Sequence, residues 1–161
     1  MSIIIRKPEL TDGKLIYELA RISKPLDLNS LYSYLLISIH FNQTSAVAET
    51  GQDIVGYVSG YIHPHQDDTL FIWQIAVNPI MRGKGLATQM LQNILQRVEL
   101  TNIKFIEATI TPSNKKSRNL FQRLAEQLKA DYKESLFLDK DLFGDSYHEE
   151  EKLLRIGPIT P

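Results

Sequence analysis

The sequence contains no cysteine among its 161 residues. This absence excludes disulfide bonds, thiolate zinc sites and a cysteine nucleophile, and it suits a protein of a reducing compartment. Long apolar runs are also missing, because no stretch approaches the roughly 20 residues that a transmembrane helix needs. The opening MSIIIRKPEL has only three apolar residues in a row before charges and a proline, which is too few for a signal peptide. We therefore expect a soluble cytoplasmic protein.

An excess of either charge is absent too. The chain has 18 basic and 19 acidic residues, so bulk charge gives no support to a nucleic-acid or membrane partner. A hydrophobic share of 43% fits one globular domain over residues 1–161. The turn His63-Pro64-His65 has no third ligand at a recognised spacing, and we expect no metal.

Periodicity and turn residues predict an alternation of strands and helices. Expected strands cover 2–7, 44–49, 54–62, 69–77, 103–110, 131–138 and 151–156. Expected helices cover 13–22, 30–41 with Asn29 or Ser30 as its cap, about 84–98 and about 113–129. This order predicts an α/β domain, with a mixed sheet and helices on both of its faces.

The segment Arg82-Gly83-Lys84-Gly85 joins an expected strand to an expected helix. Such a joint presents unpaired backbone N–H groups and the positive end of the helix dipole, and glycines let an anion approach closely. The loop is therefore a candidate phosphate cradle. It is neither a Walker A loop nor a dinucleotide fingerprint, and on its own a glycine-rich turn with two solvated charges explains it equally well.

Two ordered motifs resemble those of the GNAT superfamily of N-acetyltransferases. RGKGLA (82–87) matches the R/Q-x-x-G-x-G/A signature, and Asn114, Ser117, Leu120 and Phe121 fall where that family carries N-x-x-A-x-x-L-Y. The resemblance implies a mixed, mainly antiparallel sheet of six to seven strands with about four helices. It also implies acetyl-coenzyme A as cosubstrate, with the pyrophosphate on the loop amides and the pantetheine arm along the main chain near Ile75 and Val77. The cofactor-binding residues implied in this way are Ile75, Val77, Arg82, Gly83, Lys84, Gly85, Leu86, Ala87, Thr88, Asn114, Ser117 and Phe121.

Longer segments narrow the resemblance. LDLNSLYSYLL, DTLFIWQIAV, ATITPSNKKSRNLF and HEEEKLLRI are similar to the diaminobutyrate acetyltransferases of ectoine biosynthesis, over residues 5–156. This implies acetylation of the γ-amino group of L-2,4-diaminobutyrate. Members of that family are commonly homodimers, and by analogy the strands at 135–138 and 151–156 are candidate contact surfaces.

The same resemblance implies an acceptor site. It assigns Asp27 and Glu151 to ammonium recognition, and Tyr32, Trp73 and His148 to shaping and hydrogen bonding. From the residues alone, Trp73 would be a core side chain, Tyr32 a half-buried helix residue, Asp27 a cap and the acidic run at 149–151 a solvated turn.

The chemistry calls for direct attack by a neutral amine in a ternary complex, because no cysteine can carry the acyl group. Candidate proton acceptors are Glu151 and Asp27 through water, or Glu107 on its strand. A backbone N–H around Ala76 or Val77 is the candidate oxyanion donor.

Phe121 departs from the family pattern, which has a tyrosine there to protonate the leaving thiolate. A thiol of pKa near 8.5 can leave unaided, and Tyr32 or Tyr34 are candidate substitutes for the missing tyrosine. Two other functions stay open: acetylation of a different amine, such as a polyamine, an antibiotic or a protein N-terminus, and a non-catalytic acyl-coenzyme A sensor.

Overall fold

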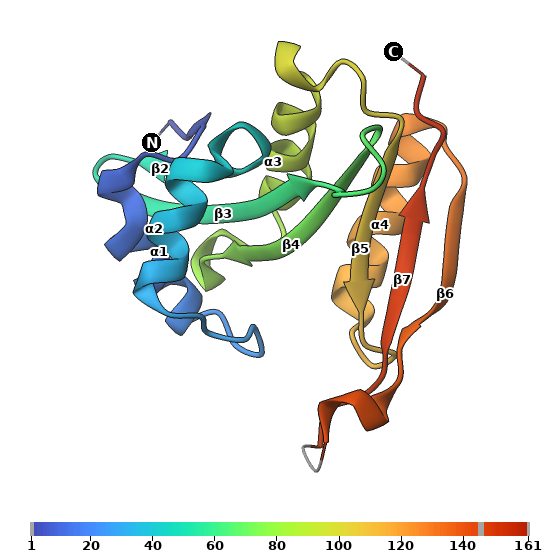
Figure 1. Ribbon diagram of the computed structural model, residues 1–161. Helices are drawn as coiled ribbons and strands as arrows, with labels where there is room; N and C mark the ends of the chain where they lie inside the picture. Colours follow the sequence, from blue (N-terminus) through green and yellow to red (C-terminus); the bar gives the residue numbers. More distant parts are fainter. Residues whose placement is uncertain (1, 145–146, 161) are drawn as a thin grey trace. The chain divides into compact units, whose positions relative to one another are not determined.

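The computed structural model describes residues 2–144 and 147–160 (Figure 1). Its strands are β1 (Ile4–Arg6), β2 (Ala46–Thr50), β3 (Asp53–Ile62), β4 (Thr69–Val77), β5 (Phe105–Ile110), β6 (Tyr132–Leu138) and β7 (Glu151–Ile156). Its α-helices are α1 (Gly13–Arg21), α2 (Leu31–His40), α3 (Leu86–Leu95) and α4 (Lys115–Leu128). Short 3-10 helices cover Leu10–Asp12, Asn42–Thr44, Pro79–Met81, Val98–Leu100 and Lys140–Phe143.

The strands form one sheet in the order β1-β2-β3-β4-β5-β7-β6. β4 and β5 run parallel, whereas β1–β2, β2–β3, β5–β7 and β6–β7 are antiparallel. The expected mixed, mainly antiparallel sheet is confirmed. Most element ends differ from expectation by a few residues. The first strand, for example, shortens to Ile4–Arg6, and α3 ends at Leu95 because the chain turns into the 3-10 helix Val98–Leu100.

The chain divides into two compact units. The N-terminal unit comprises Met1–Tyr61 and Trp73–Thr101, and the C-terminal unit comprises Ile62–Ile72 and Asn102–Pro161. Each unit is described by itself below.

The two faces of the N-terminal unit's sheet are distinguished by neighbouring residues of β2. Val47 pairs with Tyr57 and belongs to a core shared with α1 and α2, whose members are Ile16, Leu19, Ala20, Tyr34, Ile37, Val47, Ile54, Tyr57 and Ala76. Ala48 pairs with Gly56, where an added Cβ would come within 2.9 Å of the Met90 side chain on α3. Since neighbouring residues of a strand point to opposite faces, α1 and α2 cover one face and α3 the other.

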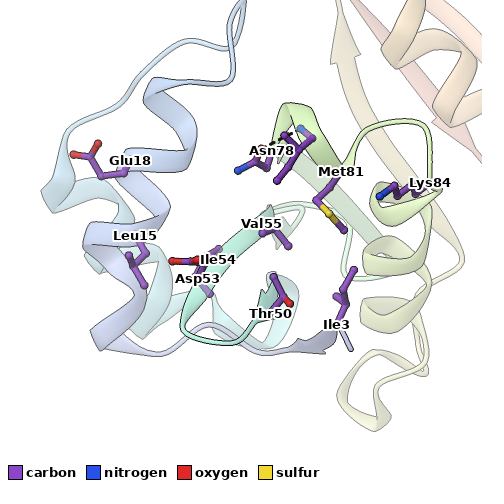
Figure 2. Close-up of a pocket in the computed structure, with 11 residues that line it drawn as sticks. Ile3, Leu15, Glu18, Thr50, Asp53, Ile54, Val55, Asn78, Met81 and Lys84 are labelled. Atoms are coloured by element: carbon purple, nitrogen blue, oxygen red, sulfur yellow. Dashed lines mark hydrogen bonds between the residues drawn. The ribbon is translucent and has the colours of Figure 1, made fainter. Parts of the chain in front are cut away.

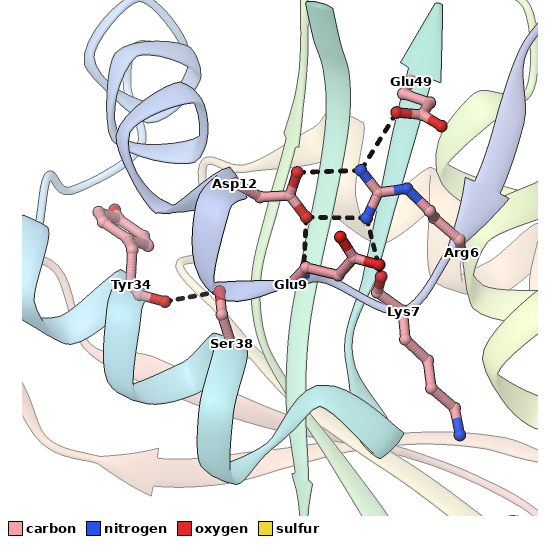
Figure 3. Close-up of polar contacts among 7 residues, drawn as sticks. All are labelled: Arg6, Lys7, Glu9, Asp12, Tyr34, Ser38 and Glu49. Atoms are coloured by element: carbon pink, nitrogen blue, oxygen red, sulfur yellow. Dashed lines mark hydrogen bonds and ion pairs between the residues drawn. The ribbon is translucent and has the colours of Figure 1, made fainter. Parts of the chain in front are cut away.

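A charged cluster joins β1, β2 and the start of α1 (Figure 3). The Arg6 guanidinium donates to both carboxylate oxygens of Asp12, at 2.8 and 2.9 Å, and to Glu49 at 3.1 Å. The Asp12 carboxylate also accepts the backbone N–H of Glu9 at 2.7 Å. Burial by itself would raise the pKa of Asp12, but the hydrogen bonds from Arg6 and Glu9 outweigh it and lower that pKa.

In the C-terminal unit, ion pairs join β5 to β7 and α4 to β6. Glu107 and Arg155 are register partners, and Arg155 Nη1 lies 2.7 Å from Glu107 Oε2. The same guanidinium stacks over the Phe105 ring, 3.8 Å from its centroid. On α4, Arg118 donates to both oxygens of Glu134 on β6, which ties the helix to the sheet.

None of the helices in the described part of the chain is both long enough and apolar enough to span a membrane.

Candidate functional site

The loop after β4 is shaped by a cap and two left-handed glycines. Asn78 Oδ1 accepts the N–H of Ile80 at 3.1 Å and starts the 3-10 turn Pro79–Met81. Gly83 and Gly85 then adopt φ values of +79° and +76° before α3 begins at Leu86. No heavy atom lies within 4 Å of the place where a Cβ on Gly83 would stand. Glycine is required here by the backbone conformation rather than by crowding, and the backbone stays open to an approaching group.

The start of α3 offers donors to that open surface. Gly85 is its N-cap and has no side chain to accept from the first-turn N–H groups, which therefore face outward with the positive end of the dipole. Arg82 Nε donates to the carbonyl of Val77 at 3.3 Å, so this side chain folds back onto the end of β4. Lys84 is exposed and lines the neighbouring cavity. This arrangement is chemically suited to a phosphate or pyrophosphate.

A cavity of about 500 Å³ adjoins the loop within the N-terminal unit (Figure 2). It is lined by Ile3, Leu15, Glu18, Thr50, Asp53, Ile54, Val55, Asn78, Ile80, Met81 and Lys84. Its walls come from α1, the β2–β3 turn and the loop itself. Its lining includes none of the residues expected at the acceptor site.

Strand β4 alternates between core and surface along its second half. Ile72, Gln74 and Ala76 are buried, whereas Trp73 is 50% exposed. Trp73 meets the ring of Tyr61 edge-on, with centroids 6.4 Å apart. The interpretation of Trp73 as a core residue is therefore wrong, because strand alternation turns it outward. Strand β4 pairs with β5 from Thr69–Phe105 to Ile72–Ala108, and β4 itself continues to Val77.

Asp27 lies in the connection between α1 and α2. Its backbone carbonyl accepts Gln74 Nε2 at 2.7 Å, and the residue itself is exposed. Asp27 is not the helix cap: Ser30 fills that role and accepts the N–H of Ser33 at 3.2 Å. Tyr32, in the first turn of α2, is 68% exposed, so it is not half-buried.

The C-terminal unit brings His148 and Glu151 together. His148 Nε2 lies 3.6 Å from Glu151 Oε1, and its Nδ1 lies 2.5 Å from the carbonyl of Glu149. The imidazole stacks on Phe143 with centroids 3.9 Å apart. This stacking fixes the ring plane and holds His148 beside Glu151 at the start of β7.

The residues of the second motif occupy the start of α4. Asn114 Oδ1 accepts the N–H of Ser117 at 3.1 Å and caps the helix. Phe121 is 3% exposed and packs into the core of its unit. The motif therefore has a structural function in starting and seating α4.

Two candidate proton carriers from the sequence are occupied elsewhere. Glu107 is bound by Arg155 in the cross-strand ion pair described above, so its carboxylate is not free. Tyr34 is fully buried and donates its hydroxyl to Gln74 Oε1 at 3.1 Å. Burial raises the pKa of Tyr34, although the hydrogen bonds from Asn29 and to Gln74 act in the opposite direction. Its expected role as a substitute for the missing tyrosine stays a prediction.

Sequence reasoning missed Gln74. A glutamine inside the apolar run TLFIWQIAV is the available signal, because a buried polar side chain must find partners. In residues 2–144 and 147–160, no group of three or more His, Asp or Glu side chains could hold a metal ion.

Comparisons with known proteins agree with this geometry. The model of the acetyltransferase (GNAT) family matches residues 14–125. The L-2,4-diaminobutyric acid acetyltransferase of Oceanobacillus iheyensis is 49% identical over 158 residues, covering 96% of this chain and 87% of that protein. The enzyme of the same name from Marinococcus halophilus is 43% identical over 159 residues, covering 99% and 92%.

The chain belongs to the GNAT acetyltransferases, within the L-2,4-diaminobutyric acid acetyltransferase family. A solved structure agrees: diaminobutyrate acetyltransferase EctA from Paenibacillus lautus, in complex with its substrate L-2,4-diaminobutyric acid and coenzyme A, matches with a TM-score of 0.95 and 38% identity. The match covers 99% of this chain and 97% of that one. The expected family and fold are both confirmed.

Proposed function

We propose that this protein transfers the acetyl group of acetyl-coenzyme A to the γ-amino group of L-2,4-diaminobutyrate, the acetylation step of ectoine synthesis. The observation that carries the proposal is the near-complete match to a diaminobutyrate acetyltransferase solved with its substrate and coenzyme A.

For the coenzyme, we assign the pyrophosphate to the amides between Gly83 and Thr88. The open backbone at Gly83 and the uncapped start of α3 support this assignment. The main chain of Ile75 and Val77 is assigned to the pantetheine arm. The Val77 carbonyl accepts Arg82 Nε, and its second lone pair can still accept a hydrogen bond from the pantetheine arm.

For the acceptor, we assign Asp27 and Glu151 to the substrate's ammonium groups. Both carboxylates belong to residues that keep solvent access, and a carboxylate is the natural partner of an alkylammonium. Trp73 supplies a half-exposed aromatic face for a cation. Tyr32 and His148 are assigned to hydrogen bonding with the amino acid.

The reaction is a direct displacement in a ternary complex. The γ-ammonium loses a proton to water held by Asp27 or Glu151, and the neutral nitrogen attacks the thioester carbon to form the C–N bond. The C–S bond breaks to release the thiolate, and the second proton of the nitrogen passes through solvent to that thiolate. A backbone N–H near Ala76 or Val77 stabilises the oxyanion. Because Phe121 is buried and has no hydroxyl, the thiolate leaves without a proton from that position.

We further propose that residues 1–161 act as one domain, as a homodimer in the cytoplasm. Exposed Leu136 and Phe137 on the edge strand β6 support a dimer contact at that edge.

The test is coenzyme A release by the purified protein with acetyl-coenzyme A and L-2,4-diaminobutyrate, with NMR assignment of the product. Acetylation at the γ-nitrogen is expected. A preference for putrescine or lysine would contradict the proposed substrate, and coenzyme binding without turnover on any amine would indicate a sensor.

A further inference from the structure

We propose that Gln74 is a positioning residue of the acceptor site, whose buried side-chain amide fixes the loop carrying Asp27 against strand β4. The inference rests on the proposed function, because it takes Asp27 as a substrate-binding residue. All the groups concerned belong to the N-terminal unit.

The amide of Gln74 uses both of its ends. Its Nε2 donates to the carbonyl of Asp27 at 2.7 Å, and its Oε1 accepts the hydroxyl of Tyr34 at 3.1 Å. The Tyr34 hydroxyl in turn accepts the backbone N–H of Asn29 at 3.3 Å. Two backbone groups of the loop, one on each side of Leu28, are therefore tied to side chains of β4 and α2.

The loop has few other attachments. Leu26 packs against the core and donates its N–H to the carbonyl of Ser23 at 3.0 Å, whereas Asp27 and Leu28 are exposed. Such a segment depends on specific hydrogen bonds for its conformation, because little apolar burial holds it. Gln74 is 6% exposed, so losing either bond would leave a polar group unpaired out of water.

Placement on β4 links this role to the substrate. Gln74 follows Trp73 in the strand, so its side chain points to the opposite face while its backbone sets the position of the indole. The segment Trp73-Gln74 of β4 thus positions the indole of Trp73 and, through the side-chain amide of Gln74, the backbone of Asp27. A polar residue with only a structural role could satisfy its hydrogen bonds with any backbone groups of the core. Gln74 instead bonds to the loop that carries Asp27.

Gln74→Met tests the proposal, because methionine keeps the volume and removes both polar ends. We expect KM for diaminobutyrate to rise about tenfold, the usual consequence of losing hydrogen bonds that hold a binding group, while KM for acetyl-coenzyme A stays within twofold. Hydrogen exchange should accelerate at least tenfold for the amides of residues 24–30 and stay unchanged inside α1 and α2. Tyr34→Phe keeps the hydrogen bond from Gln74 to the Asp27 carbonyl. It should raise KM for diaminobutyrate and the exchange rates at residues 24–30 by about threefold each.

Ser59→Ala is the matched control. Ser59 is buried on β3 and its Oγ accepts the backbone N–H of Gln74 at 3.2 Å, but among the described residues no hydrogen bond joins it to the loop. This variant should leave the KM for diaminobutyrate within twofold. Unchanged exchange at 24–30 in Gln74→Met would overturn the proposal, as would equal rises in both KM values. If the wild type acetylates another amine, the proposed substrate is wrong, and the positioning role is then decided by the exchange rates and by KM for that amine.

Discussion

Four carboxylates of this molecule form two groups, which differ in how many partners the protein gives them. Asp12 accepts two bonds from Arg6 and one from the Glu9 backbone, and Glu107 is held by Arg155; both residues are at most 5% exposed. Among the residues that the structure describes, the side chain of Asp27 makes no hydrogen bond or ion pair, and Glu151 meets only His148, at 3.6 Å.

This difference separates the scaffold from the site. A buried carboxylate must be paired, because leaving it alone costs several kcal/mol, and once paired it has no capacity for a substrate. A carboxylate left accessible contributes little to folding but can receive an ammonium group. Substitutions in the two groups should therefore affect different measurements.

The largest expected effect is on activity. Asp27→Ala and Glu151→Ala should each lower kcat/KM for diaminobutyrate by a factor of about 10³, since each removes the charged partner of a desolvated ammonium. Their free energies of unfolding should stay within about 0.5 kcal/mol of the wild type. Steady-state kinetics and urea unfolding measure the two quantities. Wild-type activity in either variant would contradict the assignment of that residue to the acceptor site.

The next effect is on stability. Asp12→Ala should lower the free energy of unfolding at pH 7 by about 3 kcal/mol, because it leaves Arg6 without its main partner. The folded-state pKa of Asp12 is lowered, so the pair stabilises the protein above the unfolded-state pKa of about 4, and this stabilisation is lost as the pH falls through the folded value. The difference in free energy of unfolding between variant and wild type, measured by urea denaturation, should therefore be smaller at pH 3 than at pH 7. A gap of the same size at both pH values would contradict the assignment.

A smaller effect is expected in the loop. Gly85→Ala places a side chain at φ +76°, which costs about 1 kcal/mol of strain, and its methyl group stands beside the first-turn N–H groups of α3 where the phosphate is expected. KM for acetyl-coenzyme A should rise about tenfold, whereas KM for diaminobutyrate should change less than threefold. Gly51→Ala, also at positive φ but in the β2–β3 turn, controls for strain alone and should leave both KM values unchanged.

The sequence predicted the helices and strands well because their apolar periods and turn residues are local signals. The phosphate loop was predictable for the same reason: glycines at 83 and 85 mark left-handed backbone. The ion-pair partners of individual carboxylates were not predictable from the sequence. Nothing local distinguishes Glu107, which meets Arg155 across 48 residues of chain, from Glu151, and both were candidate bases.

The same limit explains why Gln74 was missed and why the hydrogen-bond partner of Tyr34 was not predicted. Their shared hydrogen bond joins residues 40 positions apart, and only the packed sheet brings them together. Trp73 was predictable as a surface residue only once strand register was known, because a shift of one position would have buried it.

The smallest expected effect concerns Glu107. In Glu107→Gln the amide oxygen still accepts from Arg155, so the charge is lost but the hydrogen bond is kept, and stability should fall by about 1 kcal/mol. Turnover should stay within threefold of the wild type, with the same pH profile, because a carboxylate bound by a guanidinium is not the base of the reaction. A turnover lower by a factor of 100 would contradict the division into paired and accessible carboxylates, because it would place Glu107 in the active site. Arg155→Lys, which keeps the charge but not the planar fork, should match the stability loss and also leave turnover unaffected.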